Sequence, residues 1–146
     1  MIEKYLGRPF ELGESDCFSL IREYYHDVFG IDLPDVARPH DFWEAGLELY
    51  RKHYAQQGFE VLHLSPHEWQ HGDIILMSVL SPVANHAAIL MPDGKILHHM
   101  YGRLSEVGEY RGIWRNNTVG VYRHREVALQ EDIQMLDIRE ARVDHD

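Results

Sequence analysis

The chain has 146 residues, and its 45% hydrophobic and 26% charged residues are ordinary for one globular domain with a single core. No apolar run reaches the ~18 residues of a membrane-spanning helix, so we expect no membrane insertion. The formal net charge of −10 would repel a phosphate backbone, and no basic stripe offsets it, so nucleic acid is not an expected partner.

The N-terminal segment predicts a loop followed by a helix. Residues 1–15 contain several turn formers and lack the pattern of a secretory signal, so we expect synthesis in a cytoplasm without a signal peptide. Ser15 or Asp16 can cap the helix, and Gly30 ends it. Its apolar positions recur at offsets of three and four, namely Cys17, Leu20, Ile21, Tyr24 and Val28. Cys17 therefore lies in the first helical turn.

A second helix is predicted after the loop that Pro34 and Pro39 bracket. Asp41 is its expected cap, and Gln57-Gly58 is its expected end. One face of this helix carries Trp43, Leu47, Tyr50 and Tyr54.

After the second helix the pattern changes to short strands. They are expected at residues 59–62, 74–79, 86–91, 95–100 and 119–124. The connections lack the crossover helix that parallel strands need, which predicts an antiparallel sheet. The expected fold class is α+β, a meander of strands with the helices packed on one side.

The C-terminal residues 126–146 form an acidic tail. Seven acidic residues and two basic ones give this segment a net charge of −5, half of the total. Leu129, Ile133 and Leu136 match one apolar helical stripe, which predicts docking on the domain or on a partner. A solvated terminus is the alternative. We therefore divide the chain into a domain at residues 1–125 and a tail at residues 126–146.

Cys17 is the only cysteine, so it is either an inert core thiol or a reactive nucleophile. The start of a helix presents unpaired N–H groups and a partial positive charge, which lower the pKa of a thiol. We therefore expect alkylation of Cys17 at a pH below the ~8.5 of a free thiol. A nucleophilic cysteine also needs a histidine base that a third polar group orients, and the chain has eleven histidines.

A predicted β-hairpin supplies the candidate bases. Pro92 lacks the N–H that would close a two-residue turn, so we predict the three-residue loop Pro92-Asp93-Gly94 with glycine in its left-handed position. This register sets Ala88 opposite His98 and places His86 and His98 on one face, with His99 on the other. His86 and His98 are then diagonal neighbours.

Cys17, His86 and His98 have the residue types that a nucleophile, its base and an orienting group require. The alternative is that both histidines are polar positions on a half-buried strand.

Four parts of the sequence, within roughly residues 5 to 125, are informative together. They are Gly7-Arg8-Pro9-Phe10 with Ser15-Asp16-Cys17, Gly72-Asp73-Ile74-Ile75-Leu76, Asn85-His86-Ala87-Ala88-Ile89 and Gly94-Lys95-Ile96-Leu97-His98-His99. With these segments the chain resembles the NlpC-type family of cell-wall cysteine peptidases, particularly its branch in phage tail-tip assembly proteins. By this resemblance Cys17 is the nucleophile, His86 the general base and His98 the polar third member.

The resemblance also implies a fold and a function. The fold is a papain-like α+β domain, and the substrate is the peptidoglycan stem peptide, cut between a γ-D-glutamyl group and a diamino acid. The chemistry uses no cofactor and no metal. A member of this branch is made in the host cytoplasm and assembles with other tail-tip proteins into the virion.

The sequence departs from the family pattern at two places. Phe18-Ser19 stands where many members have Ser-Gly, and Phe10 stands where many have a tyrosine. If that tyrosine binds the oxyanion, its hydroxyl is missing here, although the backbone N–H of Cys17 remains one donor. The possible substitutes, which the sequence does not rank, are Tyr5, Tyr24 and Tyr25.

Two other functions are open. The segment His67-Glu68-Trp69-Gln70-His71 is an H-E-x-x-H sequence of the zinc-protease type. Pro66 and Gly72 leave a helix there only about one and a half turns, so we prefer a polar surface turn anchored by Trp69. The second alternative keeps the fold without catalysis, as a structural tail-tip protein.

Overall fold

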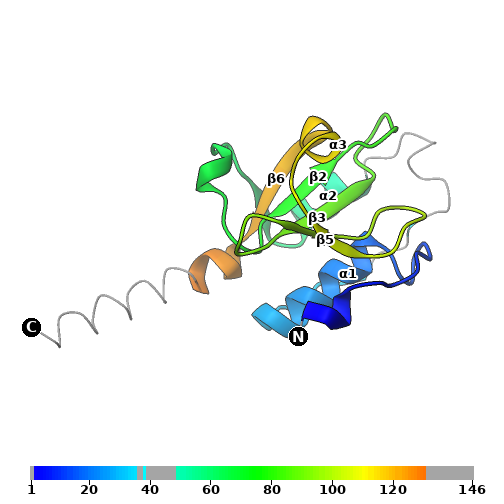
Figure 1. The fold of residues 1–146 in the computed structure, drawn as a ribbon. Coiled ribbons are helices and arrows are strands. Elements are labelled where there is room, and N and C mark those ends of the chain that lie inside the picture. The colour runs from blue at the N-terminus through cyan, green and yellow to red at the C-terminus, as the bar shows by residue number, and fades with distance from the viewer. Residues whose placement is uncertain (1, 36–37, 39–48, 131–146) are drawn as a thin grey trace, which may run out of the picture.

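The computed structural model describes residues 2–35, 38 and 49–130, and its centre is a six-stranded sheet (Figure 1). Its strands are β1 (Phe59–Val61), β2 (Ile74–Met77), β3 (His86–Leu90), β4 (Ile96–His98), β5 (Glu106–Gly108) and β6 (Thr118–His124). All paired neighbours are antiparallel, which confirms the predicted α+β class.

The strand order is β1-β6-β2-β3-β4-β5, so the predicted simple meander is wrong at one place. The last strand, β6, lies between β1 and β2. Its neighbouring residues Val121 and Tyr122 point to opposite faces of the sheet and are both buried, which suits an interior strand.

Several short elements are absent from the sequence-based prediction, because three or four residues leave too little periodicity to detect. These elements are β5, helix α3 (Ile113–Asn116) and the 3₁₀ turns η1 (Ile2–Tyr5) and η3 (Pro66–Glu68). Two of them, β5 and α3, contribute to the candidate site.

Helix α1 (Cys17–Tyr24) begins where the sequence predicts. The Asp16 carboxylate accepts a hydrogen bond from the Ser19 N–H at 3.0 Å, and the Ser19 hydroxyl accepts one from the Asp16 N–H at 2.8 Å. This reciprocal capping box identifies Asp16 as the cap and sets Cys17 at the first helical position.

A π-helical turn, η2 (Tyr25–Phe29), continues α1 and ends at Gly30, whose φ is 68°. This wider turn changes which residues face the core. Tyr25 is fully buried, whereas Val28 is 45% exposed, so the predicted apolar stripe is wrong at Val28.

Helix α2 (Leu49–Gln56) is the described part of the second predicted helix. Tyr50 and Tyr54 are buried, as the predicted face requires, and Gly58 follows the helix with a φ of 92°. The predicted cap and the remaining face residues, Asp41, Trp43 and Leu47, lie outside the described residues.

The two faces of the sheet carry separate hydrophobic layers. Helices α1 and α2 pack on the face that includes Ile74 and Ala87, and Figure 1 shows α1 along this side of the sheet. The opposite face includes Ile75 and Ala88, and loop residues together with Trp114 of α3 cover it. The predicted packing of the two longer helices on one side is confirmed.

The chain after β6 begins to pack on the domain. Residues 125–130 are helical, and Val127 is buried in the core with 1% of its surface exposed. Leu129 is 58% exposed, and the other stripe residues, Ile133 and Leu136, lie outside the described residues. Among the residues that the structure describes, no helix has the length and apolar character needed to cross a membrane.

Candidate active site

Strands β3 and β4 form the predicted hairpin. The Met91 N–H donates to the Lys95 carbonyl at 2.8 Å, and Gly94 has a φ of 83°, so the loop contains the three predicted residues. The register pairs Ala88 with His98, which confirms the predicted alignment.

His86 and His98 form a buried pair on one face of this hairpin. His86 Nε2 lies 2.9 Å from His98 Nδ1, and each residue is 1% exposed. The Trp114 ring packs against both, with its centroid 4.6 Å from that of His98 and 5.8 Å from that of His86. Burial lowers the pKa of His98 to about 4 and that of His86 well below its ordinary value. Both imidazoles are therefore neutral at pH 7, the state in which one of them can accept a proton.

Glu106 of β5 is the cross-strand partner of His98. Its Oε1 lies 3.3 Å from His98 Nε2, the ring nitrogen that does not face His86. Burial lowers the pKa of His98, and the charge of Glu106 raises it by a smaller amount. Sequence reasoning missed Glu106 and Trp114 because it predicted neither β5 nor α3.

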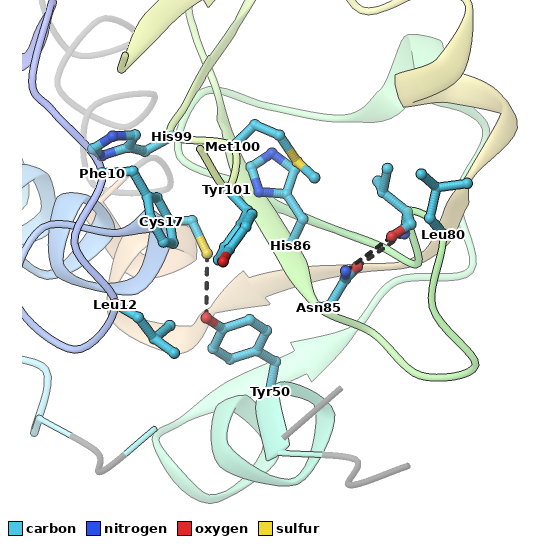
Figure 2. Close-up of a pocket in the computed structure, with 11 residues that line it drawn as sticks. Phe10, Leu12, Cys17, Tyr50, Leu80, Asn85, His86, His99, Met100 and Tyr101 are labelled. Atoms are coloured by element: carbon cyan, nitrogen blue, oxygen red, sulfur yellow. Dashed lines mark hydrogen bonds between the residues drawn. The ribbon is translucent and has the colours of Figure 1, made fainter. Parts of the chain in front are cut away.

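Cys17 stands at the start of α1 with 3% of its surface exposed. Its Sγ lies 3.4 Å from the hydroxyl oxygen of Tyr50 in α2, as Figure 2 shows. Within the described residues no hydrogen bond joins the thiol to His86. Burial, with the charge of Asp16 as the second cause, raises the pKa of Cys17 to about 12. The predicted lowering at the helix start is wrong, because desolvation of the thiolate outweighs it.

A cavity of about 220 Å³ is lined by both Cys17 and His86. Tyr50 also reaches it, and Phe10 and Tyr101 provide aromatic walls (Figure 2). None of the described residues that line it carries a carboxylate, an ammonium or a guanidinium group. The structure thus brings the predicted nucleophile and the predicted base to one cavity.

His99 is a second imidazole of this cavity. Its ring lies edge-on to Phe10, at 5.3 Å between centroids, and its Nε2 lies 2.9 Å from the Arg103 carbonyl oxygen. The predicted hairpin register places His99 on the face opposite His86 and His98, so the site predicted from the sequence does not include it.

The three tyrosines considered as substitutes for the missing hydroxyl lie elsewhere. The Tyr5 hydroxyl donates to Asp27 at 2.7 Å, the Tyr24 hydroxyl pairs with His71 Nε2 at 2.6 Å, and the Tyr25 hydroxyl donates to the Gly72 carbonyl. None of the three lines the cavity, whereas Tyr50 does. Sequence reasoning placed Tyr50 only in a hydrophobic face.

The H-E-x-x-H segment does not form a zinc-binding helix. The turn η3 ends at Glu68, so His67 and His71 do not share one helical face. His71 Nε2 instead pairs with the Tyr24 hydroxyl. Within the described parts of the chain, no three His, Cys, Asp or Glu side chains are grouped as a metal site.

Comparison with known proteins gives relatives along most of the chain. Two relatives are named tail tip assembly protein K. That of Escherichia phage lambda is 40% identical over 119 residues, which are 82% of this chain and 58% of the relative. That of Escherichia phage N15 is 35% identical over 128 residues, which are 86% of this chain and 51% of the relative. The chain thus spans little more than half the length of these relatives.

A solved structure shares the fold. It is a protein of the NLP/P60 family from Staphylococcus aureus, described as similar to lipoprotein, with a TM-score of 0.55 at 24% identity. The similarity covers 83% of this chain and 38% of that protein. Residues 7–123, which include Cys17, His86 and His98, match the model of the NlpC/P60 family. The chain therefore belongs to the NlpC/P60 family.

Proposed function

We propose that the chain is a cysteine peptidase of a phage tail tip that hydrolyses peptidoglycan stem peptides between a γ-D-glutamyl group and a diamino acid. The observation that carries this proposal is the buried His86–His98 hydrogen bond beside the cavity that Cys17 also lines. The substrate follows the family resemblance, and the tail-tip location follows the names of the two phage relatives. Its partners are then other tail-tip proteins, assembled with it into the virion after synthesis in the host cytoplasm.

Glu106 favours one direction for the hydrogen bond between His86 and His98. The negative charge of the Glu106 carboxylate, whose Oε1 lies 3.3 Å from His98 Nε2, favours the tautomer of His98 with its proton on that nitrogen. His98 Nδ1 is then unprotonated and accepts from the N–H at His86 Nε2. This leaves the lone pair of His86 on Nδ1, which we assign as the basic atom. His98 acts as the orienting third member.

The reaction begins when the S–H bond of Cys17 turns from the Tyr50 oxygen toward His86 and the thiol gives its proton to Nδ1, while Sγ stays beside the Tyr50 hydroxyl. Burial disfavours a free thiolate, so proton transfer accompanies attack of sulfur on the carbonyl carbon. A C–S bond forms as the π electrons of the carbonyl move to its oxygen. The tetrahedral intermediate then expels the amine, which takes the proton from His86. Water then attacks the carbonyl carbon of the acyl-enzyme while His86 accepts a proton from it. The C–S bond breaks, the carboxylic acid product leaves, and His86 returns the proton to the Cys17 sulfur.

The test is digestion of purified muropeptides by the wild type and by three variants, with products followed by mass spectrometry. We expect Cys17→Ala to abolish cleavage, and His86→Ala to lower kcat by about 10²–10⁴-fold. His71→Ala and treatment with a chelator should leave cleavage intact, because His71 contacts Tyr24 rather than the cavity. Loss of cleavage with the chelator but not with Cys17→Ala would refute the thiol mechanism.

His99→Ala addresses the other imidazole of the cavity. We expect it to cost less activity than His86→Ala, because His99 lacks the contact with His98 that orients His86. A larger loss with His99→Ala would reassign the base.

A second candidate function is a structural tail-tip protein without catalysis. The observation that favours it is the resting state of Cys17, a buried thiol with a raised pKa that contacts Tyr50 and not His86. Absence of cleavage by wild-type protein in the muropeptide assay would support this alternative.

A further inference from the structure

Tyr50 places a phenolic hydroxyl beside Cys17, and such a hydroxyl is missing at Phe10, where many members of the family have a tyrosine. Its hydroxyl oxygen lies 3.4 Å from Cys17 Sγ and lines the same cavity, whereas Phe10 brings only an apolar ring. In Figure 2, Tyr50 and His86 come from different elements and approach the Cys17 side chain from different directions. The two groups therefore do not compete for one position at the sulfur.

The Tyr50 ring is held rigidly by its surroundings. It is 2% exposed and stacks parallel to Phe18, the residue after Cys17, at 6.0 Å between centroids. The Tyr54 ring packs against it from the next turn of α2 at 6.4 Å. A donor fixed in this way needs no reorganisation when charge develops beside it, and this is the property that makes oxyanion holes effective.

The Tyr50 hydroxyl is also in the correct protonation state. Burial raises the pKa of Tyr50 well above its ordinary value, so the hydroxyl keeps its proton and remains a donor at neutral pH. When sulfur bonds to a carbonyl carbon, the oxygen on that carbon becomes negative. That oxygen is two bonds from the sulfur, so it lies within reach of the Tyr50 hydroxyl when the substrate carbonyl points toward α2. The backbone N–H of Cys17, at the start of α1, provides a second donor.

We infer that Tyr50 is a catalytic residue whose hydroxyl donates a hydrogen bond to the negative charge that develops at Cys17, first on the sulfur as its proton leaves and then on the oxyanion of the tetrahedral intermediate. It takes the place of the hydroxyl that Phe10 lacks. Donation to the oxyanion rests on the proposed peptidase function, whereas donation to the sulfur does not.

The test compares Tyr50→Phe with the matched control Tyr54→Phe. Both changes remove one buried phenolic hydroxyl from α2, and both rings pack on Phe18. Tyr54 does not line the cavity, and its hydroxyl has no hydrogen-bond partner among the described residues. Urea denaturation of each variant confirms that the fold is retained.

The first measurement is the rate of iodoacetamide alkylation across pH 7–11. Cys17 is the only cysteine, so mass spectrometry reports on this thiol alone. We expect Tyr50→Phe to slow alkylation by roughly tenfold or more at a given pH and to move the profile to higher pH, because the thiolate loses a donor. Tyr54→Phe should match the wild type. Equal rates for Tyr50→Phe and wild type would overturn donation to the sulfur.

The second measurement is muropeptide cleavage. Tyr50→Phe should lower kcat by about 10²–10³-fold with KM little changed, the cost of removing one oxyanion donor. An unchanged kcat would overturn the oxyanion role. If the wild type does not cleave, the proposed peptidase function and the oxyanion role fail together, and the alkylation rates still decide whether Tyr50 donates to the sulfur.

Discussion

The buried His98 makes the stability of the domain depend on pH. Its pKa is about 4 in the folded chain, against an ordinary value of 6.5. Because the pKa is lowered on folding, the unfolded chain binds more protons than the folded chain between these two values. The stabilisation that comes from keeping His98 neutral is therefore complete above pH 6.5 and is lost as the pH falls toward 4.

The magnitude follows from proton linkage. From His98 alone, the free energy of unfolding should fall by about 2 kcal/mol between pH 7 and pH 5, and by about 3 kcal/mol by pH 4. That is a large share of the roughly 5–15 kcal/mol that stabilises a typical domain. The assay is urea denaturation of the wild type and of His98→Gln at pH 7 and pH 5, followed by tryptophan fluorescence.

The two proteins should respond differently to acid. His98→Gln begins less stable at pH 7, because it loses the contact with His86, but it should lose about 2 kcal/mol less than the wild type on going to pH 5. His67→Gln is the control, since that side chain is 79% exposed, and it should respond as the wild type does. Equal losses for His98→Gln and the wild type would refute the claim that His98 is held neutral.

Three further predictions concern single side chains. Glu106→Ala should lower kcat for muropeptide cleavage by roughly tenfold, a modest effect because solvent screens this half-exposed carboxylate. Unchanged kinetics would show that Glu106 does not help to orient His98. Leu80 lines the cavity, is 98% exposed and has a φ of 51°, a conformation that glycine adopts without strain. Leu80→Gly should therefore raise the free energy of unfolding, measured by urea denaturation, by about 0.5 kcal/mol. It should also raise KM, because the cavity loses an apolar side chain that can contact the substrate. Arg123 makes two 2.9 Å contacts to the buried carboxylate of Asp73, and Arg123→Ala should lower the free energy of unfolding by about 3 kcal/mol. A loss below about 1 kcal/mol would mean that water replaces the guanidinium.

Local chemistry made much of the fold predictable. The Asp16–Ser19 capping box and the Pro92-Asp93-Gly94 loop act through neighbouring residues, so their sequence pattern identifies the start of α1 and the register of β3 with β4. The position of β6 between β1 and β2 depends on contacts between distant segments. No local pattern specifies such a pairing, and the prediction failed there.

The same distinction applies to the candidate site. Residue type and spacing by themselves determined Cys17 as a helix-start thiol and His86 and His98 as same-face neighbours, because capping and hairpin register are short-range effects. Only the tertiary structure decided that Tyr50 meets the sulfur and Glu106 meets His98, since each pair joins separate elements. It also reversed the expected shift in the pKa of Cys17. Burial is a property of the whole packed domain, and desolvation of the thiolate exceeds the effect of the helix start that the sequence reveals.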